Sequence, residues 1–141
     1  LQLTLPPKVP VTGSVVVTTP QDIALIDARK AVDMFRKVNI PIFGVLENMS
    51  VHICSQCGHS EAIFGSGGGQ NLAETLKVPL LGQLPLALPV REAMDTGSAL
   101  ALQRNHPQIA EIYQQAALSV ALAVADKGKD FSGRFPKIVI E

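Results

Sequence analysis

The sequence predicts an α/β protein in which a parallel sheet carries helices on both faces. Short runs of apolar, often β-branched residues alternate with longer segments whose apolar residues recur at helical spacing. Strands that are apolar throughout are typical of parallel sheets, because covering helices bury both of their faces. The chain has 141 residues, of which 47% are hydrophobic. This is enough to bury a core of its own.

Charge and hydropathy exclude several function classes. Charged residues make up 17% of the chain and the formal net charge is +0. A disordered chain combines low hydrophobicity with high net charge, and a general nucleic-acid binder has a basic face, so neither is expected. No apolar run approaches the roughly 18 residues that span a bilayer, and no signal peptide is recognisable. We therefore expect no nucleic-acid partner and no membrane association.

The first strand is predicted at residues 14–19 and leads into a helix that ends at about Val38. Thr19 is expected to be the N-cap, Pro20 the first helical residue and Asp22 an acidic residue of the first turn. An apolar stripe on this helix is expected to face the sheet. It consists of Ala24, Ala28, Ala31, Val32, Phe35 and Val38.

The remaining elements follow the same alternation. A second buried strand is predicted at residues 41–48, a short helix from the glycine-rich run to Lys77, and a third strand at residues 79–85. A brief helix is expected at residues 90–96, before a longer one that starts at Pro107. Its predicted buried stripe is Ile109, Ile112, Tyr113, Ala116, Val120, Ala123 and Val124. Residues 127–141 are expected to form a loosely attached tail.

The glycine-rich run at residues 65–69 invites comparison with a phosphate-binding loop, because free amides at a helix N-terminus bind anions. The P-loop pattern also needs a lysine that reaches the phosphates and a hydroxyl for magnesium. Gln70 and Asn71 stand at those positions instead. The run therefore favours a flexible start of a helix, and we expect this chain to lack a phosphate-binding loop.

Two cysteines, Cys54 and Cys57, are the strongest chemical signal, since their spacing lets two thiolates converge on one metal from a tight turn. Zinc and iron–sulfur clusters usually take four ligands. The other two could be His52 and His59, or the same cysteines of a second copy of the chain. A pair of inert thiols is the third possibility. A dithiol oxidoreductase is disfavoured, because the second cysteine leads into a loop and not into a helix.

Several motifs together resemble the Mrp/ApbC family. They are residues 11–28, residues 47–50 (Glu-Asn-Met-Ser), the cysteine motif through His59, residues 63–65, residues 81–86 and the pair Arg91-Glu92. The family consists of P-loop ATPases that are related to MinD and nitrogenase iron protein and act as iron–sulfur cluster carriers. The resemblance implies that residues 1–126 are the C-terminal portion of such an ATPase domain, with a metal-binding loop at residues 51–60. The Walker A half of the P-loop NTPase fold would then precede Leu1.

The resemblance also implies roles for individual residues. Asn48 matches the asparagine that recognises adenine, and its carboxamide offers the donor and acceptor that a purine edge requires. Cys54 and Cys57 match the pair that holds a [4Fe–4S] cluster bridging two subunits. A set of five residues matches the loop that packs around the base. It consists of Pro85, Leu86, Ala87, Val90 and Arg91.

These implications give a functional expectation. The intact protein would be a cytoplasmic, homodimeric, ATP-dependent carrier that delivers a [4Fe–4S] cluster to apoproteins, with Mg²⁺ and ATP bound in the part that carries the phosphate loop. No catalytic residue is expected in this chain, which alone should not hydrolyse ATP. The alternative is a zinc-stapled, non-enzymatic dimerisation module in which both cysteines bind zinc.

Overall fold

The computed structural model describes residues 11–127 of the chain; the predicted tail, apart from its first residue, lies outside them. The elements in chain order are β1 (Ser14–Thr18), α1 (Asp22–Lys37), β2 (Ile42–Ile53), β3 (Ser60–Glu61), α2 (Gly68–Leu76), β4 (Leu80–Ala87), α3 (Leu88–Asp95), α4 (Ala99–Asn105) and α5 (Pro107–Lys127). Strands and helices alternate as the sequence predicted.

The central strand of the sheet is β2, which pairs in parallel with β1 and with β4. Residues 45–47 of β2 pair on one edge with β1 and on the other with β4. The short strand β3 runs antiparallel to the end of β2, on the edge that β1 occupies further back. The three long strands therefore form a parallel sheet, and β3 adds a local hairpin to it.

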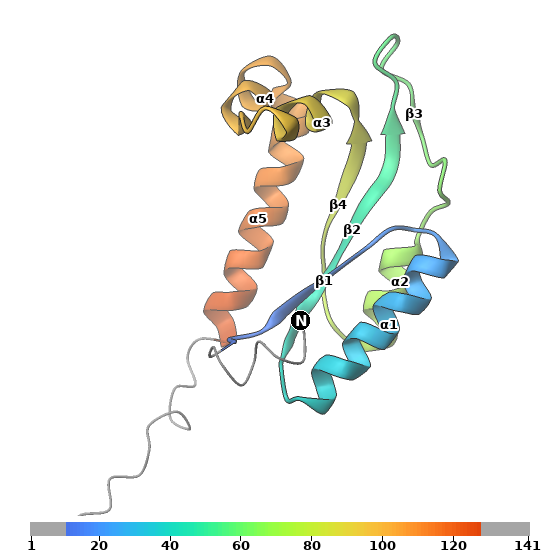
Figure 1. Ribbon diagram of the computed structural model, residues 1–141, viewed down its shortest axis with the longest axis vertical. Coiled ribbons are helices and arrows are strands. Elements are labelled where there is room, and N and C mark those ends of the chain that lie inside the picture. The colour runs from blue at the N-terminus through green and yellow to red at the C-terminus, as the bar shows by residue number, and fades with distance from the viewer. Residues whose placement is uncertain (1–10, 128–141) are drawn as a thin grey trace, which may run out of the picture.

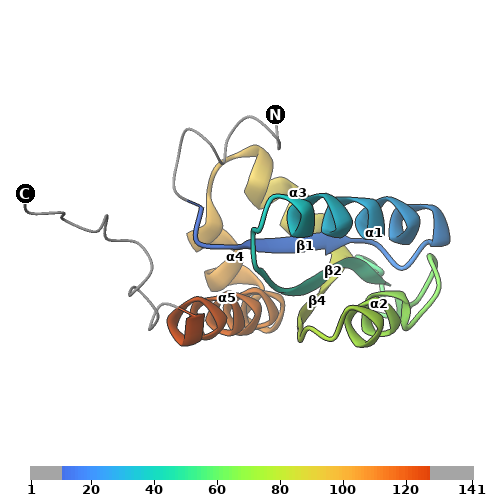
Figure 2. The same ribbon diagram turned by 90° about the horizontal axis from the view of Figure 1, so that it is seen from below.

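Helices cover both faces of this sheet. In Figure 1, α5 lies on one side of the strands, and α1 and α2 lie on the other. Seen from below, α1 lies beside β1, and α2 lies nearer to β2 and β4 (Figure 2). The main core joins Val16 and Val45 of neighbouring strands to Ala28 and Val32 of α1 and to Leu72 of α2. The predicted fold class is confirmed.

On the opposite face, α5 packs closely on β4 at a glycine. A Cβ added at Gly82 would lie 2.8 Å from the Cβ of Ala116, which is buried. A smaller core of Ala93, Leu102 and Ala110 joins α3, α4 and α5. None of the described helices has the length and apolar character to cross a membrane.

Some boundaries differ from the sequence prediction. The N-cap of α1 is Gln21 and not Thr19, whose Oγ1 instead donates to Oε1 of Gln21 at 3.1 Å. The first helical hydrogen bond runs from Leu25 N–H to the Gln21 carbonyl, so Pro20 precedes the helix. The strand β2 continues past Asn48 to Ile53, and the short helix α4 was not predicted.

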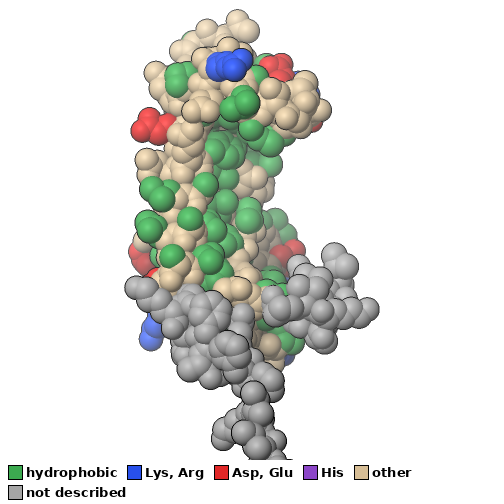
Figure 3. All heavy atoms as spheres, turned by 90° about the vertical axis from the view of Figure 1, so that its left-hand side faces the viewer, with side chains coloured by type: hydrophobic (Ala, Val, Ile, Leu, Met, Phe, Trp, Pro, Cys, Tyr) green, Lys and Arg blue, Asp and Glu red, His purple; other side chains and the backbone are tan. Residues whose placement is uncertain are grey.

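The predicted buried stripe of α5 is only partly buried. Ala116 is 5% exposed, but Ile112 and Val124 are 36% and 39% exposed. Leu118 and Leu122 of the same helix are also exposed, and hydrophobic side chains gather on this side of the molecule in Figure 3. The helix contacts mainly β4, α4 and β2, so part of its circumference lies against no other described element.

Candidate functional site

The two cysteines lie at the tip of the β2–β3 hairpin. The N–H of Cys54 donates to the carbonyl of His59 at 2.9 Å, and the N–H of Gly58 donates back to the carbonyl of Cys54 at 2.9 Å. Gly58 has a φ of 73°, in the left-handed region that suits glycine, and an added Cβ would meet nothing within 4 Å. The glycine is therefore needed for the bend of the backbone and not for space.

Backbone amides of this turn favour the thiolate form of Cys54. The N–H of Cys57, the N–H of Gln56 and then the Cys57 thiol lower the pKa of the Cys54 thiol from its ordinary value, while burial raises it slightly. Cys54 is partly exposed and Cys57 is exposed. The thiolate is the form that binds metals. The turn therefore favours the binding of a metal ion or cluster that approaches the thiols from solvent.

The turn brings two candidate metal ligands, the thiols of Cys54 and Cys57, close together. Within residues 11–127, no three side chains of the metal-binding types converge on a point. The local set of two thiolates and two imidazoles is therefore not formed by His52 and His59. His52 pairs in the sheet with Glu61 and Leu86, which fixes it in the strand. No other residue in the described part of the chain offers the two further ligands that a four-ligand site at these cysteines would need.

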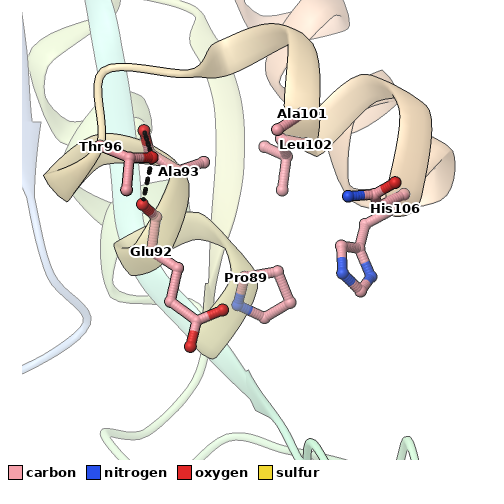
Figure 4. Close-up of a pocket in the computed structure, with 8 residues that line it drawn as sticks. Pro89, Glu92, Ala93, Thr96, Ala101, Leu102 and His106 are labelled. Carbon is pink, nitrogen blue, oxygen red and sulfur yellow. Dashed lines mark hydrogen bonds between the residues drawn. The ribbon is translucent and has the colours of Figure 1, made fainter.

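A hollow of about 340 Å³ lies beside Cys54, between the cysteine turn and the start of α3. Leu88 and Pro89 form one wall, and His106, which lies between α4 and α5, and Ile109 of α5 form another. A smaller hollow of about 150 Å³ between α3 and α4 shares Pro89, Glu92 and His106 with it. In Figure 4 the Pro89 ring lies between the Glu92 carboxylate and the His106 ring, so the two ionisable groups do not face each other.

Of the predicted adenine-binding residues, the sheet brings Asn48 close to Pro85, where the pairing of β2 with β4 changes register. Asn48 pairs with Leu84, next to Pro85, and the register then slips, so that His52 pairs with Leu86. Oδ1 of Asn48 accepts a hydrogen bond from the N–H of Met49 at 2.9 Å. The oxygen has two lone pairs, so this bond still leaves Asn48 one acceptor position and its N–H donors for a base.

The other predicted base-binding residues differ in exposure. Pro85 and Ala87 are buried, Leu86 is half-buried, and Val90 packs on the small core of α3, α4 and α5. Arg91 is exposed, and its Nη1 donates to Oδ2 of Asp95 at 2.8 Å, along α3. The sequence motif thus contains residues that shape the loop as well as residues that can touch a ligand.

The glycine-rich run that precedes α2 receives a buried carboxylate from its own chain. Glu47 is 1% exposed, and its Oε2 accepts from the N–H of Gly69 at 2.5 Å. Its Oε1 accepts from Nε2 of Gln83 at 2.7 Å. Glu47 is part of the Glu-Asn-Met-Ser motif, but the sequence alone indicates no role for it. Its partners are too distant in sequence for a local pattern to reveal them.

Comparison with known proteins identifies the family. The family described as ParA, NUBPL iron-transfer P-loop NTPase, matches residues 1–121. The chain belongs to this family. Curated relatives include the iron-sulfur cluster carrier protein of Pseudomonas fragi, which is 59% identical over 119 residues, covering 84% of this chain and 42% of the relative. The iron-sulfur cluster carrier protein of Escherichia coli (strain K12) is 52% identical over 133 residues, 94% of this chain and 36% of the relative.

The chain therefore spans about two fifths of the length of these family members. A solved structure of the nucleotide-binding protein from Archaeoglobus fulgidus in complex with ADP is similar, with a TM-score of 0.54 and 29% identity. The similarity covers 62% of this chain and 36% of that protein. The resemblance on which the sequence analysis relied is confirmed at the level of family and fold.

Proposed function

We propose that this chain provides the cluster-binding part of an ATP-dependent iron–sulfur carrier. Cys54 and Cys57 would hold one side of a [4Fe–4S] cluster, which is the cargo, and the same pair from a second copy would hold the other side. The observation that carries the proposal is the turn that presents two thiols to solvent, with no third candidate ligand among residues 11–127. The names of the curated relatives support cluster transfer as the activity.

The chemistry of the turn fits a cargo better than a buried structural metal. A structural site is closed by four ligands of its own fold, whereas ligands at an exposed hairpin tip can be exchanged for those of a recipient apoprotein. In the exchange, a recipient thiol loses its proton and binds iron, and a carrier thiolate takes up a proton as it leaves. This ligand exchange changes no oxidation state, so it needs neither an oxidant nor a reductant.

Anaerobic reconstitution with iron and sulfide tests the ligand assignment. The chain should develop the broad visible absorbance of a cluster, and Cys54→Ala should abolish it. Ser55→Ala, in the same turn, is the matched control and should keep it. Unchanged absorbance in Cys54→Ala would refute the assignment. Metal analysis after purification without added metal tests the alternative, because about one zinc per two chains without iron uptake would favour a zinc-stapled dimer.

We further propose that Asn48 and the loop of Pro85, Leu86, Ala87, Val90 and Arg91 contact adenine. Support comes from the pairing that places Asn48 beside Leu84 and Pro85, and from the ADP in the name of the similar structure. Amide chemical shifts of the isolated chain should move around Asn48 and this loop on adding millimolar ADP, and move less with GDP. Equal shifts with both nucleotides would contradict base recognition by Asn48.

ATP hydrolysis belongs, in this proposal, to a polypeptide that also has a phosphate-binding loop and binds Mg²⁺. The 141-residue chain should therefore release phosphate from ATP at the background rate. A homodimer in the cytoplasm remains the expectation that the resemblance supplies, and the oligomeric state is measured in the experiment that closes the Discussion.

A further inference from the structure

We propose that Glu47 is a positioning residue for the cysteines: its buried carboxylate fixes both ends of the segment that carries them. The bond from the N–H of Gly69 to Oε2 of Glu47 joins residues 22 positions apart, and the paired residues of the β2–β3 hairpin, 52–61, lie between them. The inference deepens the proposed function, since it concerns the geometry of the same ligands.

The outgoing arm of this segment is held by the sheet. From Asn48 onward, β2 keeps pairing with β4, through His52 with Leu86 and Ile53 with Ala87. Oγ of Ser50 also donates to the carbonyl of Leu84 at 3.1 Å, which secures the strand where its register slips. Cys54 therefore follows a strand that is anchored on the body of the protein.

The returning arm has far fewer attachments. After the two residues of β3, the chain from Ala62 to Ser66 is mostly exposed. The backbone hydrogen bond within it, from the N–H of Gly65 to the carbonyl of Ala62 at 3.0 Å, is internal to the arm. The arm is anchored again where Gly68 packs on Pro20 and Gly69 bonds to Glu47. The carboxylate is thus the polar anchor at the end of this arm.

Gly69 lets the carboxylate of Glu47 come very close to the start of α2. A Cβ added at Gly69 would lie 2.8 Å from both Cβ and Oε2 of Glu47, so only glycine lets the start of α2 approach the acid. Within residues 11–127, no Lys or Arg forms an ion pair with Glu47. The negative charge is instead stabilised by hydrogen bonds and by the positive end of the α2 dipole.

Oε1 extends the same anchor to β4. Nε2 of Gln83 donates to it at 2.7 Å, and Gln83 is the residue that pairs with Glu47 across the two strands. One carboxylate therefore joins β2, β4 and α2 just before the register between the two strands changes on the way to the cysteine turn. This arrangement also explains the glycine run that resembles a phosphate loop, because the anion at this helix N-terminus is a side chain of the protein.

Hydrogen exchange on the metal-free chain tests the inference directly. Glu47→Gln keeps the shape and an acceptor for Gly69 but loses the charge, while Gly69→Ala keeps the acid and pushes α2 away from it. Peptides from the returning arm should exchange about tenfold faster in both variants, the difference between a charge-assisted and a neutral hydrogen bond. Peptides from β1 and α1 should be unchanged. Ser66→Ala, in the same loop, and Glu74→Gln, on the exposed side of α2, are the matched controls.

Cobalt(II) serves as the probe for the cysteines, because thiolate coordination gives it visible absorption bands. Both variants should bind Co²⁺ about tenfold more weakly than the wild type and the controls do. Unchanged exchange in the arm, uniformly faster exchange throughout the chain, or unchanged Co²⁺ affinity would each overturn the positioning role. If the wild type took up no cluster, the proposed function would fail while the exchange result would still decide whether Glu47 positions the turn.

Discussion

Replacing Gly82 by alanine should push α5 away from β4. Gly82 lies on β4 where α5 crosses it, and Ile109 of the same helix contributes to the wall beside Cys54. A substitution at this crossing therefore tests the packing that holds α5 on the sheet. The contact is between one strand residue and one helix residue, which makes it suitable for a double-mutant cycle.

The structure sets the size of the effect. The new Cβ would lie 2.8 Å from Cβ of Ala116 and 3.3 Å from Cδ1 of Leu46. Carbon atoms in contact prefer about 3.5–4.0 Å, so the helix must move by roughly an ångström. Overpacking of this kind costs about 1–3 kcal/mol of the free energy of unfolding. Ala116→Gly alone should cost about 2 kcal/mol, through helix propensity and loss of a buried methyl group.

Urea denaturation of the wild type, both single variants and the double variant gives the four free energies of the cycle. Removing the methyl group of Ala116 makes room for the one added at Gly82, so the double variant should be about 1–2 kcal/mol more stable than the sum of the single effects predicts. Additive losses would show that the two residues do not clash and would refute the described packing of α5 on β4.

Two further predictions concern local backbone geometry. The neighbouring N–H groups of Cys57 and Gln56 lower the pKa of the Cys54 thiol. Alkylation of Cys54 by iodoacetamide in the metal-free chain should therefore reach half its maximal rate at a lower pH than alkylation of free cysteine does. A midpoint at or above that of free cysteine would contradict this cause. Lys77 ends α2 with a left-handed φ of 57°, so Lys77→Gly should stabilise the fold by about 1 kcal/mol in thermal unfolding, whereas Lys37→Gly, inside α1, should destabilise it.

Local patterns were sufficient to predict most of the elements. The signals for β1 and α1 lie within a few residues of sequence, and both elements formed where expected, although only Ala28 and Val32 of the predicted stripe are buried. The end of β2 was wrong because Asn48-Met49-Ser50 is typical of a strand terminus. The strand instead continues through Met49 with a φ of 56°, and Ser50 bonds to Leu84 of β4. That stabilisation comes from a distant strand and leaves no local signal.

In the candidate site too, the features with a local sequence signal were predictable and those with distant partners were not. The cysteine spacing alone predicted a two-thiol turn, because both residues and the glycine that bends the backbone are adjacent in sequence. The role of the glycine run depended on Glu47, whose carboxylate reaches Gly69 only after β2 and α2 have packed together. A buried acid with distant partners can be assigned from the tertiary structure and not from a motif.

The most direct test of the proposed function is native mass spectrometry of the anaerobically reconstituted chain, combined with iron and sulfide analysis. We predict a species of two chains with one [4Fe–4S] cluster, equivalent to about two irons per chain, since each turn supplies only two thiolates. Cys54→Ala should give chains without iron. A cluster on a single chain, or two chains joined by zinc with no iron uptake, would contradict it.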